Sequence, residues 1–547
     1  MQNFNSPLEA FLHWEQKNPN ASFLIQPING SIIRYSFAEA GVEARKIAAA
    51  IKAYDLPKQS HIALLSKNCA HWIISDLAIM MSGHVSIPLY PTSSADSIQH
   101  VLEHSESKAI IIGKLDDFES QKSGIPDIHK ISIGLYGENE GQSWEEIITN
   151  QVPIIEFPVI KSEDIFTIIY TSGTTGHPKG AVHTVGNFVE STNVIRSVME
   201  LPQGARLFSY LPLAHAAERI GIGTHGLVVG AEFSFPESLT TFASDLEKCQ
   251  PDIFFGVPRI WTKFQEKILE IIPQKKLNFL FNIPILGRVI KGKLKGKLGL
   301  SNAKFIISGA APLSASVMRW YKKMGIEILQ GYGMTEDCII SHFNLLENNK
   351  IGTVGKRLPN VKTKLSPEGE ILIKNNCLFK EYYKDPETTA SVFDEEGYFR
   401  TGDKGEYDHD GFLSITGRIK DQFKTDKGKY ISPSSIELKL AKNPVIEQIC
   451  VVGTGIPQPI TLITLSEVGN AMTKESLVQS LSDTLVEVNP KLKKYERIEK
   501  IVIMREDWTV DNGLITPTLK VKRNSIEKIH QEYYNSWFKT KEKVIFE

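Results

Sequence analysis

The chain has 547 residues, 41% of them hydrophobic and 23% charged, which is the composition of a globular protein with the length for at least two domains. Its formal net charge of -1 excludes a general attraction to polyanions, so nucleic acid is not expected as a partner. The five cysteines have no CxxC spacing and the N-terminus carries no secretory signal, so we expect reduced thiols in a cytoplasmic protein.

The first third of the chain alternates helical patterns with short apolar runs. Small and apolar residues at helical spacing predict a helix over 40–51, and an apolar stretch predicts another after Ala70. Runs of β-branched residues that begin at His61, Val85 and Lys108 predict strands. Strands separated by helices indicate parallel βαβ units, so the expected fold class is α/β.

Two later apolar runs end in loops of small and hydroxyl-bearing residues. IFTIIYT from Ile165 and KFIISG from Lys304 predict buried strands, and each leads into a loop rich in Gly, Ser or Thr. Open α/β sheets bind their ligands at the carboxyl ends of the strands. We therefore expect a binding site at these loops.

The composition changes where two domains are predicted to meet. The later part is rich in Lys and Glu, with short strands from Ile446 and Ile498 and a helix over 475–488. We predict a large domain over 1–417 and a smaller mixed α/β domain over 418–547.

The sequence YTSGTTGHPKG, from Tyr170 to Gly180, carries the strongest functional signal. It follows a predicted strand and is not a Walker A loop, because no GKS or GKT follows its glycines. Backbone N–H groups and hydroxyls in such a turn can surround phosphate oxygens, and a lysine adds positive charge. The expected nucleotide-binding residues of this loop are Thr171, Ser172, Gly173, Thr174, Thr175, Gly176 and Lys179.

This loop resembles the phosphate loop of the adenylate-forming superfamily, which includes acyl-CoA synthetases, luciferases and nonribosomal adenylation domains. QGYGMTE and SGAAPL are similar to the superfamily's adenine-binding segments. The resemblance implies that Tyr332 stacks on the adenine, and that Glu336, helped by Thr171, binds magnesium. The nucleotide-binding residues implied by these two segments are Gly309, Ala310, Ala311, Gln330, Gly331, Tyr332, Gly333 and Thr335.

Two further segments follow in the superfamily's order. YFRTGD ends at Asp403, whose carboxylate is implied to hold the ribose hydroxyls. GRIKDQFKTDKGKYISP places Arg418 at the ribose or the phosphates and Lys420 at the hinge between the domains. In this segment Lys424 and Tyr430 match nucleotide-side positions of fatty acyl-CoA synthetases.

The segment TPTLKVKR resembles the region of the superfamily's catalytic lysine, and its position favours Lys520 over Lys522. Many relatives have Gly directly before this lysine, whereas here the neighbour is Leu519. The TPTxK form is similar to the long-chain acyl-CoA synthetase branch. A solvated basic tail would account equally well for a single lysine, so the motif carries the assignment.

The resemblance implies a large N-terminal domain of α/β sheets and a smaller mobile C-terminal domain that bears the catalytic lysine. It implies an enzyme that uses ATP and Mg²⁺ to convert an acid to acyl-AMP and pyrophosphate, and that then transfers the acyl group to coenzyme A. Rotation of the small domain about the hinge would separate these two steps. The catalytic residues implied are Lys520, Thr335, Glu336, Arg418 and His215.

The substrate class follows from weaker signals. LPLAHAAERIG resembles a segment of the long-chain branch that carries a gate histidine, and His215 matches that position. A histidine beside an apolar run is also often a satisfied core residue. GVPRIWTK, from Gly256, is typical of the same branch, so we expect a long-chain fatty acid as substrate.

A basic segment raises the question of membrane contact. LGRVIKGKLKGKLGL, from Leu286 to Leu300, contains Arg288 and four lysines. Such bases can attract an anionic bilayer, but a charge run is often a solvated face, and the glycines weaken an amphipathic helix. No segment has the apolar length of a spanning helix, so we expect at most a peripheral contact at the inner membrane face.

Three alternatives remain open in the sequence. A fatty acyl-AMP ligase would pass the acyl group to a carrier protein instead of coenzyme A, and a β-lactone synthetase would use similar motifs on hydroxy acids. A non-catalytic nucleotide-binding scaffold belongs to another class, and the presence of Lys520, Glu336 and the glycine-rich loop argues against it. Release of AMP and pyrophosphate would separate an enzyme from a scaffold.

Overall fold

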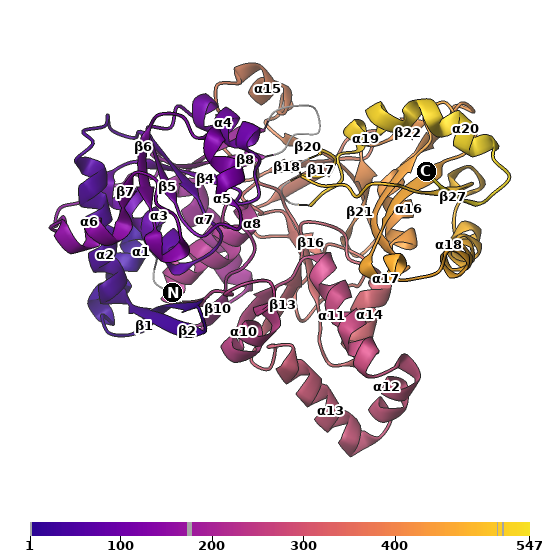
Figure 1. Ribbon diagram of the computed structural model, residues 1–547, viewed down its shortest axis with the longest axis horizontal. Helices are drawn as coiled ribbons and strands as arrows, with labels where there is room; N and C mark the ends of the chain where they lie inside the picture. Colours follow the sequence, from indigo (N-terminus) through magenta and orange to yellow (C-terminus); the bar gives the residue numbers. More distant parts are fainter. Residues whose placement is uncertain (1–2, 172–177, 511, 517–518) are drawn as a thin grey trace.

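The computed structural model describes residues 3–171, 178–510, 512–516 and 519–547 (Figure 1). Within these ranges an eight-stranded sheet has the order β19-β9-β8-β4-β3-β5-β6-β7. Its neighbours from β8 to β7 pair in parallel, which confirms the parallel βαβ units expected from the sequence. The strands are β3 (His61–Leu65), β4 (Val85–Leu89), β5 (Ala109–Ile112), β6 (His129–Ser132), β7 (Gln142–Ser143), β8 (Ile165–Thr171), β9 (Lys179–Thr184) and β19 (Glu381–Tyr382).

A nine-stranded sheet forms the second layer, with the order β16-β15-β14-β13-β12-β10-β11-β1-β2 among the described residues. Its central neighbours β13 and β14 are parallel, so the loops that follow them lie at the same edge. The strands are β1 (Ser22–Ile28), β2 (Ser31–Ser36), β10 (Arg206–Phe208), β11 (Glu232–Ser234), β12 (Ile253–Phe255), β13 (Phe305–Ser308), β14 (Leu329–Tyr332), β15 (His342–Phe343) and β16 (Lys356–Arg357).

Helix α3 (Ala70–Ser82) lies between the two sheets, because it contacts β3 and β4 of one sheet and β1 of the other. All of its residues are buried, which explains its nearly unbroken apolar sequence. The other helices before the C-terminal domain are α1 (Pro7–Lys17), α2 (Phe37–Lys52), α4 (Ala95–His104), α5 (Phe118–Gln121), η1 (Lys122–Gly124), η2 (Gly134–Tyr136), α6 (Trp144–Asn150), α7 (Val185–Val198), α10 (Phe242–Cys249), α11 (Pro258–Ile271), α12 (Gln274–Phe281), α13 (Pro284–Lys297), α14 (Ala315–Lys323) and α15 (Pro386–Ser391).

Three short helical elements follow one another without a break: α8 (Ala216–Glu218), the π-helical segment η3 (Arg219–Thr224) and α9 (His225–Val229). The buried Arg219 guanidinium fixes this run to α3 through an ion pair of 2.7 Å with Asp76. Single π turns inside helices are uncommon and often lie at functional sites. This one directly follows the segment that contains His215.

Four antiparallel strands join the large domain to the C-terminal domain: β17 (Lys362–Leu365), β18 (Glu370–Lys374), β20 (Phe399–Tyr407) and β21 (Leu413–Arg418). The C-terminal domain, at the upper right of Figure 1, has its own apolar cores. Its elements are β22 (Phe423–Lys424), β23 (Tyr430–Ile431), α16 (Pro433–Leu440), β24 (Ile446–Val452), β25 (Ile460–Leu465), α17 (Glu467–Asn470), α18 (Lys474–Val488), η4 (Asn489–Lys491), η5 (Lys494–Glu496), β26 (Ile501–Ile503), α19 (Arg523–His530), η6 (Gln531–Tyr533), α20 (Tyr534–Lys539) and β27 (Val544–Phe546).

The expected fold class is therefore confirmed, as a large α/β domain followed by a smaller mixed one. The strand expected from Ile498 is shorter and starts at Ile501. The glycines of the basic segment do not prevent a helix, because α13 continues through them to Lys297. Gly287 is required at the junction with α12, since a Cβ there would approach the carbonyl oxygen of Phe281 to 2.8 Å.

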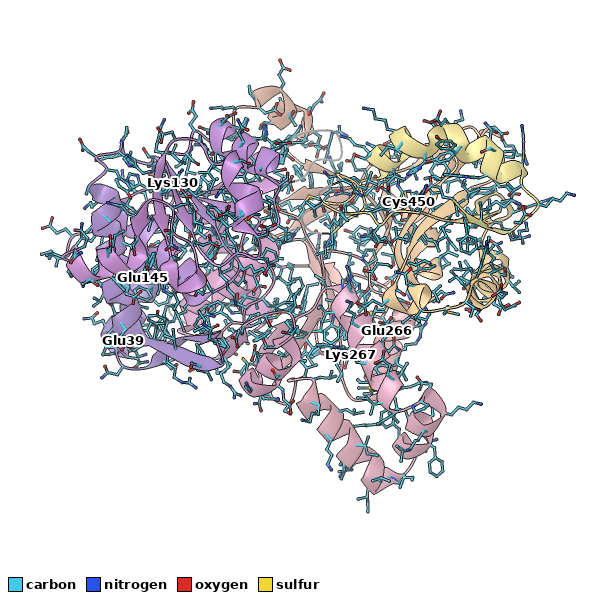
Figure 2. All side chains as sticks on the ribbon, in the orientation of Figure 1. Glu39, Lys130, Glu145, Glu266, Lys267 and Cys450 are labelled. Atoms are coloured by element: carbon cyan, nitrogen blue, oxygen red, sulfur yellow. The ribbon has the colours of Figure 1, made fainter. Side chains whose placement is uncertain are left out.

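All five cysteines are free and buried. Cys450 lies inside the C-terminal domain (Figure 2). In the large domain the thiol of Cys338 lies 3.2 Å from Nδ1 of the buried His183, and burial raises the pKa of the Cys338 thiol. Among the described residues, no helix is both long enough and apolar enough to cross a bilayer.

Candidate active site

Asp403 lies at the centre of a three-residue polar cluster. It stands directly opposite Arg418 in the pairing of β20 with β21, and Arg418 Nε donates to Asp403 Oδ1 at 2.6 Å. The hydroxyl of Tyr332, at the end of β14, donates to Asp403 Oδ2 at 2.8 Å. Since both carboxylate oxygens are bonded, the negative charge of Asp403 raises the pKa of Arg418. Burial, and then Asp403, raise the pKa of Tyr332.

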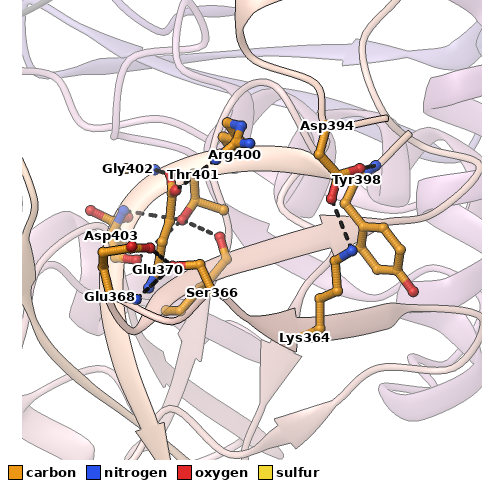
Figure 3. Close-up of polar contacts among 11 residues, drawn as sticks. Lys364, Ser366, Glu368, Glu370, Asp394, Tyr398, Arg400, Thr401, Gly402 and Asp403 are labelled. Carbon is orange, nitrogen blue, oxygen red and sulfur yellow. Dashed lines mark hydrogen bonds and ion pairs between the residues drawn. The ribbon is translucent and has the colours of Figure 1, made fainter. Parts of the chain in front are cut away.

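A second layer of side chains holds the backbone of Asp403 (Figure 3). Glu370 Oε1 accepts a hydrogen bond of 2.9 Å from the N–H of Gly402. The hydroxyl of Thr401 accepts one of 3.1 Å from the N–H of Asp403 and donates to the carbonyl of Ile371. The hydrogen bonds of Glu370 and Thr401 thus hold the backbone of β20 at Asp403 and so position its carboxylate.

The segment from Gln330 to Glu336 runs from β14 into a tight turn. A Cβ on Gly333 would lie 2.5 Å from the carbonyl carbon of Ile339, so the turn requires glycine there. Thr335 is buried, and Glu336 is half-buried and accepts a hydrogen bond of 2.8 Å from the hydroxyl of Tyr382. The structure thereby places the residues expected at the adenine and the metal beside the Asp403 cluster.

The segment Gly309–Ala310–Ala311 leaves β13, the parallel neighbour of β14, as the sequence motifs predict. Gly309 is buried beside the ring of Phe255, whereas the two alanines are exposed. Ala310 has a φ of 65°, in the left-handed region. The loop therefore presents short side chains on the same edge as Tyr332.

Strand β9, which follows the predicted phosphate loop, begins beside polar residues that the sequence motifs do not include. Lys179 Nζ lies 3.1 Å from Thr388 Oγ1, 3.6 Å from Asp385 and 5.5 Å from the ring centroid of Tyr382. Thr171 stands opposite Lys179 in the pairing of β8 with β9. The predicted residues Ser172, Gly173, Thr174, Thr175 and Gly176 lie outside the described residues.

A local signal does exist for Asp385. It immediately precedes Pro386 and caps α15, with its carboxylate accepting from the N–H of Thr388 at 3.0 Å. Aspartate before a proline at the first helical position is a recognised helix start. That pattern predicts a cap, but not the contact with Lys179, which depends on the pairing of β19 with β9.

Lys520 of the C-terminal domain lies within electrostatic range of Asp403 and Arg418. The side chain of Lys520 is exposed to solvent at its surface, but protein atoms around it displace part of its hydration. This desolvation lowers the pKa of Lys520, and the positive charge of Arg418 lowers it further. The carboxylates of Asp403 and Glu336 oppose this shift. Because three of these charged groups act on one ammonium group, the sequence-predicted lysine is near Arg418, Asp403 and Glu336.

The loop before Lys520 has a strained backbone. Leu519 has a φ of 60°, a left-handed conformation that costs a residue with a side chain about 1–2 kcal/mol. The turn is closed by Thr516, whose hydroxyl accepts from the N–H of Lys520 at 3.0 Å and whose N–H donates to the Lys520 carbonyl. This conformation explains why glycine suits the position before the lysine. Lys522 instead lies at the N-cap of α19.

His215 lies at the start of α8, where its Nδ1 accepts a hydrogen bond of 3.2 Å from the N–H of Ala217. Burial, and then the charge of Lys520, lower the pKa of His215 to about 4. The ring is therefore neutral near pH 7, with its proton on Nε2. His215 is both a helix cap and a neighbour of Lys520.

The three remaining predicted residues lie beyond β21. Lys420 is exposed in the turn that directly follows this strand. Lys424 and Tyr430 are cross-strand partners, with the ammonium 5.6 Å from the ring centroid. In the described part of the chain, no hydrogen bond or ion pair joins these two residues to Asp403.

The order and spacing of these segments match a known family. Residues 11–383 match the family described as AMP-binding enzyme, and residues 420–542 match the AMP-binding enzyme C-terminal domain. The first match alone covers more than half of the chain. The chain belongs to the AMP-binding enzyme family.

Relatives and solved structures extend this family match over nearly the whole chain. A long-chain-fatty-acid–CoA ligase, FadD15 of Mycobacterium bovis, is 29% identical, with 94% of this chain and 93% of the relative covered. Long chain acyl-CoA synthetase 6 of Arabidopsis thaliana is 28% identical, with 94% and 83% covered. The crystal structure of the anthranilate CoA ligase AuaEII with anthranoyl-AMP shares the fold, with a TM-score of 0.80, 20% identity, and 98% and 99% covered.

The donor set of this AMP-binding enzyme fits a magnesium ion that is shared with a nucleotide. No group of three or more His, Cys, Asp or Glu side chains that could hold a metal occurs among the described residues. Mg²⁺ commonly takes one or two carboxylates together with substrate phosphates and water. Glu336, with one oxygen bonded to Tyr382, provides one carboxylate, and Thr171 ends the strand that leads to the phosphate loop.

Proposed function

We propose that this AMP-binding enzyme is a long-chain fatty acid–CoA ligase. It would convert a fatty acid and ATP to acyl-AMP and pyrophosphate, and then acyl-AMP and coenzyme A to acyl-CoA and AMP. The observation that carries the proposal is that the charges of Asp403 and Glu336 in the large domain, and of Arg418 at the domain boundary, act on the ammonium group of Lys520 from the C-terminal domain. The names of the relatives support the fatty acid as substrate.

In the first step an oxygen of the fatty acid attacks the α-phosphorus in line, and pyrophosphate leaves. Two anions must approach each other, so catalysis depends on positioning and on neutralising charge. Lys520 would bridge the carboxylate and the α-phosphate, Lys179 would meet the departing phosphates, and Asp403 would bind the ribose hydroxyls. Glu336 and Thr171 would hold Mg²⁺, which supplies positive charge to phosphate oxygens.

The nucleotide contacts of this proposal use the cluster and its neighbours. Tyr332 would stack on the adenine between the glycine-containing turns, and Thr335 would bond the α-phosphate. Arg418 is already held by Asp403, which would keep its remaining N–H groups directed at ribose or phosphate. Lys424 and Tyr430 are partners in the β22–β23 hairpin, so the C-terminal domain would contribute their nucleotide contacts.

In the second step the thiol of coenzyme A attacks the acyl carbonyl and AMP leaves. We assign the domain boundary to 417/418 and the hinge to Lys420, which is the second residue after β21 and is exposed. Rotation there would remove Lys520 from the adenylate. Lys420→Pro should still form acyl-AMP at a normal rate but lose thioester formation; equal retention of both half-reactions would show that the hinge lies elsewhere.

His215 is proposed to guard the entrance for the acyl chain. As a neutral ring with the proton on Nε2, it can donate a hydrogen bond to the fatty acid carboxylate without adding charge. His215→Ala should raise the KM for fatty acid more than the KM for ATP. Parallel measurement of both KM values tests this, and His409→Ala, at an exposed histidine, is the matched control.

Pyrophosphate release tests the function as a whole. The enzyme is mixed with ATP, Mg²⁺ and acids from C2 to C20, each with and without coenzyme A. Release that peaks with long chains and turns over only with coenzyme A is the expected result. Fatty-acid-dependent release that stops after about one equivalent with coenzyme A present would favour a carrier protein as acceptor. No release with any acid would contradict the proposal that this protein is an adenylating enzyme.

The cellular location is also a proposal. A cytoplasmic enzyme with a peripheral contact at the inner membrane face fits its lipid substrate and its five unpaired cysteines. Nucleic acid is not proposed as a partner, because the formal net charge is -1.

A further inference from the structure

The helices α12 and α13 form a hairpin that projects from the lower edge of the molecule, away from both large sheets and from the C-terminal domain (Figure 1). Helix α11, whose Glu266 and Lys267 are labelled in Figure 2, connects the body of the large domain to this hairpin. We call residues 274–297 the α12–α13 hairpin. The proposed catalytic residues all lie outside it.

The charge of this region is strongly one-sided. Residues 271–300 contain seven Lys or Arg and no Asp or Glu, in a chain whose formal net charge is only -1. Lys297 pairs with Glu247 at 2.8 Å. In the described part of the chain the other six have no carboxylate within 4.0 Å, and they are Lys275, Lys276, Arg288, Lys291, Lys293 and Lys295.

Large apolar side chains are exposed on the same hairpin. Ile285 is 83% exposed, Phe279 is 67% exposed and Val289 is 48% exposed. Ile285 and Val289 are four residues apart, so they lie on one face of α13. Arg288 and Lys293 flank this face at neighbouring helical positions. An apolar stripe bordered by cations is the pattern of helices that lie in a membrane interface.

A groove runs along another side of α13. It has a volume of about 350 Å³ and is lined by both basic and apolar side chains. Arg288, Lys291 and Lys295 line it from positions spaced by three and four residues, opposite Phe281 and Met324. Lys291 Nζ lies 5.0 Å from the ring centroid of Phe281. Such a groove fits an anionic headgroup attached to an apolar chain.

We propose that the α12–α13 hairpin docks this protein onto a bilayer that contains acidic phospholipids. Ile285, Val289 and Phe279 enter the boundary between headgroups and acyl chains, and the unpaired cations lie over the phosphates. Nucleic acid would meet the cations but would leave the aliphatic side chains without a role. A second copy in a symmetric contact would place the cations against one another.

Vesicle flotation without ATP or fatty acid tests the proposal, so its failure is separate from failure of the proposed reaction. The vesicles contain phosphatidylglycerol and phosphatidylcholine, or phosphatidylcholine alone. The wild-type protein is expected to float with the acidic vesicles. Arg288→Gln with Lys291→Gln and Lys295→Gln should lower the partition coefficient at least about tenfold, because each base near an anionic surface contributes on the order of a fivefold change.

The matched control removes the same charge elsewhere. Lys528→Gln with Lys539→Gln and Lys541→Gln neutralises three exposed lysines of the C-terminal domain and should leave flotation unchanged. Gly292→Leu should increase flotation, since a Cβ there meets nothing within 4 Å and the new side chain extends the apolar face. A wild-type thermal transition of the Gly292→Leu variant is needed beside this gain, because an unfolded chain would also expose apolar surface to the vesicles.

Three outcomes would overturn the proposal. The first is equal flotation of the wild-type protein and the Arg288, Lys291 and Lys295 variant. The second is binding to a DNA duplex without binding to acidic vesicles. The third is a dimer that dissociates on Ile285→Asp with Val289→Asp while flotation is unchanged. Far-UV circular dichroism and a cooperative thermal transition, both at wild-type values, verify that each variant is folded.

Discussion

The two domains contribute to the candidate site in different ways. On the large-domain side, Asp403 has both oxygens bonded and Glu336 is bonded by Tyr382. The side chain of Lys520, from the C-terminal domain, forms no hydrogen bond or ion pair with the described residues, and only its backbone is tied to Thr516. On the proposed function, the large domain would supply a prearranged nucleotide platform and Lys520 a single movable charge. Damage to the platform should affect both half-reactions, and damage to Lys520 only the first.

Lys520→Ala should have the largest effect. Acyl-AMP formation should fall about 10²- to 10³-fold, because a preorganised positive group at the developing charge is lost. Thioester formation from added acyl-AMP and coenzyme A should stay within a few-fold of wild type. Rapid-quench measurement of each half-reaction provides the test, and Lys522→Ala is the control. Equal loss in both steps would mean that Lys520 also belongs to the platform.

Asp403→Asn should impair both half-reactions by about 10- to 100-fold, mainly through weaker binding of the nucleotide. The asparagine keeps the shape but removes the charge that holds Arg418, and hydrogen bonds to charged groups contribute about 1.5–3 kcal/mol. Titration of ATP and of acyl-AMP gives the two affinities. Asp410→Asn, at an exposed aspartate paired with Lys350, is the control. Loss in only one half-reaction would contradict a common platform.

The pH dependence of the first step should reveal the environment of Lys520. Its pKa is lowered, so the ammonium form disappears at a lower pH than for an ordinary lysine. The alkaline limb of kcat/KM for acyl-AMP formation should therefore lie below the usual lysine value, and Lys520→Arg should move it upward. If the alkaline limb of the pH profile does not move in Lys520→Arg, the limb reports the titration of another group.

Substitutions of Leu519 should have smaller effects on stability. Leu519→Gly relieves the left-handed strain of the folded state but also increases the conformational entropy of the unfolded chain. The free energy of unfolding should therefore rise by at most about 1 kcal/mol. Leu519→Val should lower it by a similar amount, because a β-branched residue tolerates this conformation poorly. Thermal unfolding of both variants provides the comparison. A less stable Gly variant together with an unchanged Val variant would show that the backbone at Leu519 is not strained.

The smallest effect is expected at the contact between the domains. Arg259 on α11 pairs with Glu447 on β24, and both side chains are partly exposed. Exposed pairs contribute about 0.2–1 kcal/mol. Arg259→Ser should therefore shift the domain equilibrium away from the arrangement seen here by no more than a few-fold. A fluorescence distance between labelled domains can measure the shift, and restoration of the pair by Arg259→Lys is the control.

The sequence predicts the strands and motif loops well because each depends on local residues. The cluster of Tyr332, Asp403 and Arg418 also follows once the motifs are placed on neighbouring strands. The contacts of Tyr382 with Glu336 and of Asp385 with Lys179 cannot be predicted from the sequence, because they depend on strands about 200 residues apart in the chain that pair as neighbours. Likewise, the left-handed backbone of Leu519 cannot be predicted from the sequence, because leucine strongly prefers negative φ values.

The burial of the cysteines has a chemical consequence for the proposed formation of an acyl-adenylate. A mixed anhydride acylates any thiolate that it meets, and Cys338 is only two residues from Glu336. That thiol is enclosed beside His183, and its raised pKa keeps it protonated. With all five thiols buried, self-acylation is suppressed, and an incoming thiol from outside is the available acceptor. The intermediate can thus wait for its acceptor without consuming the enzyme that made it.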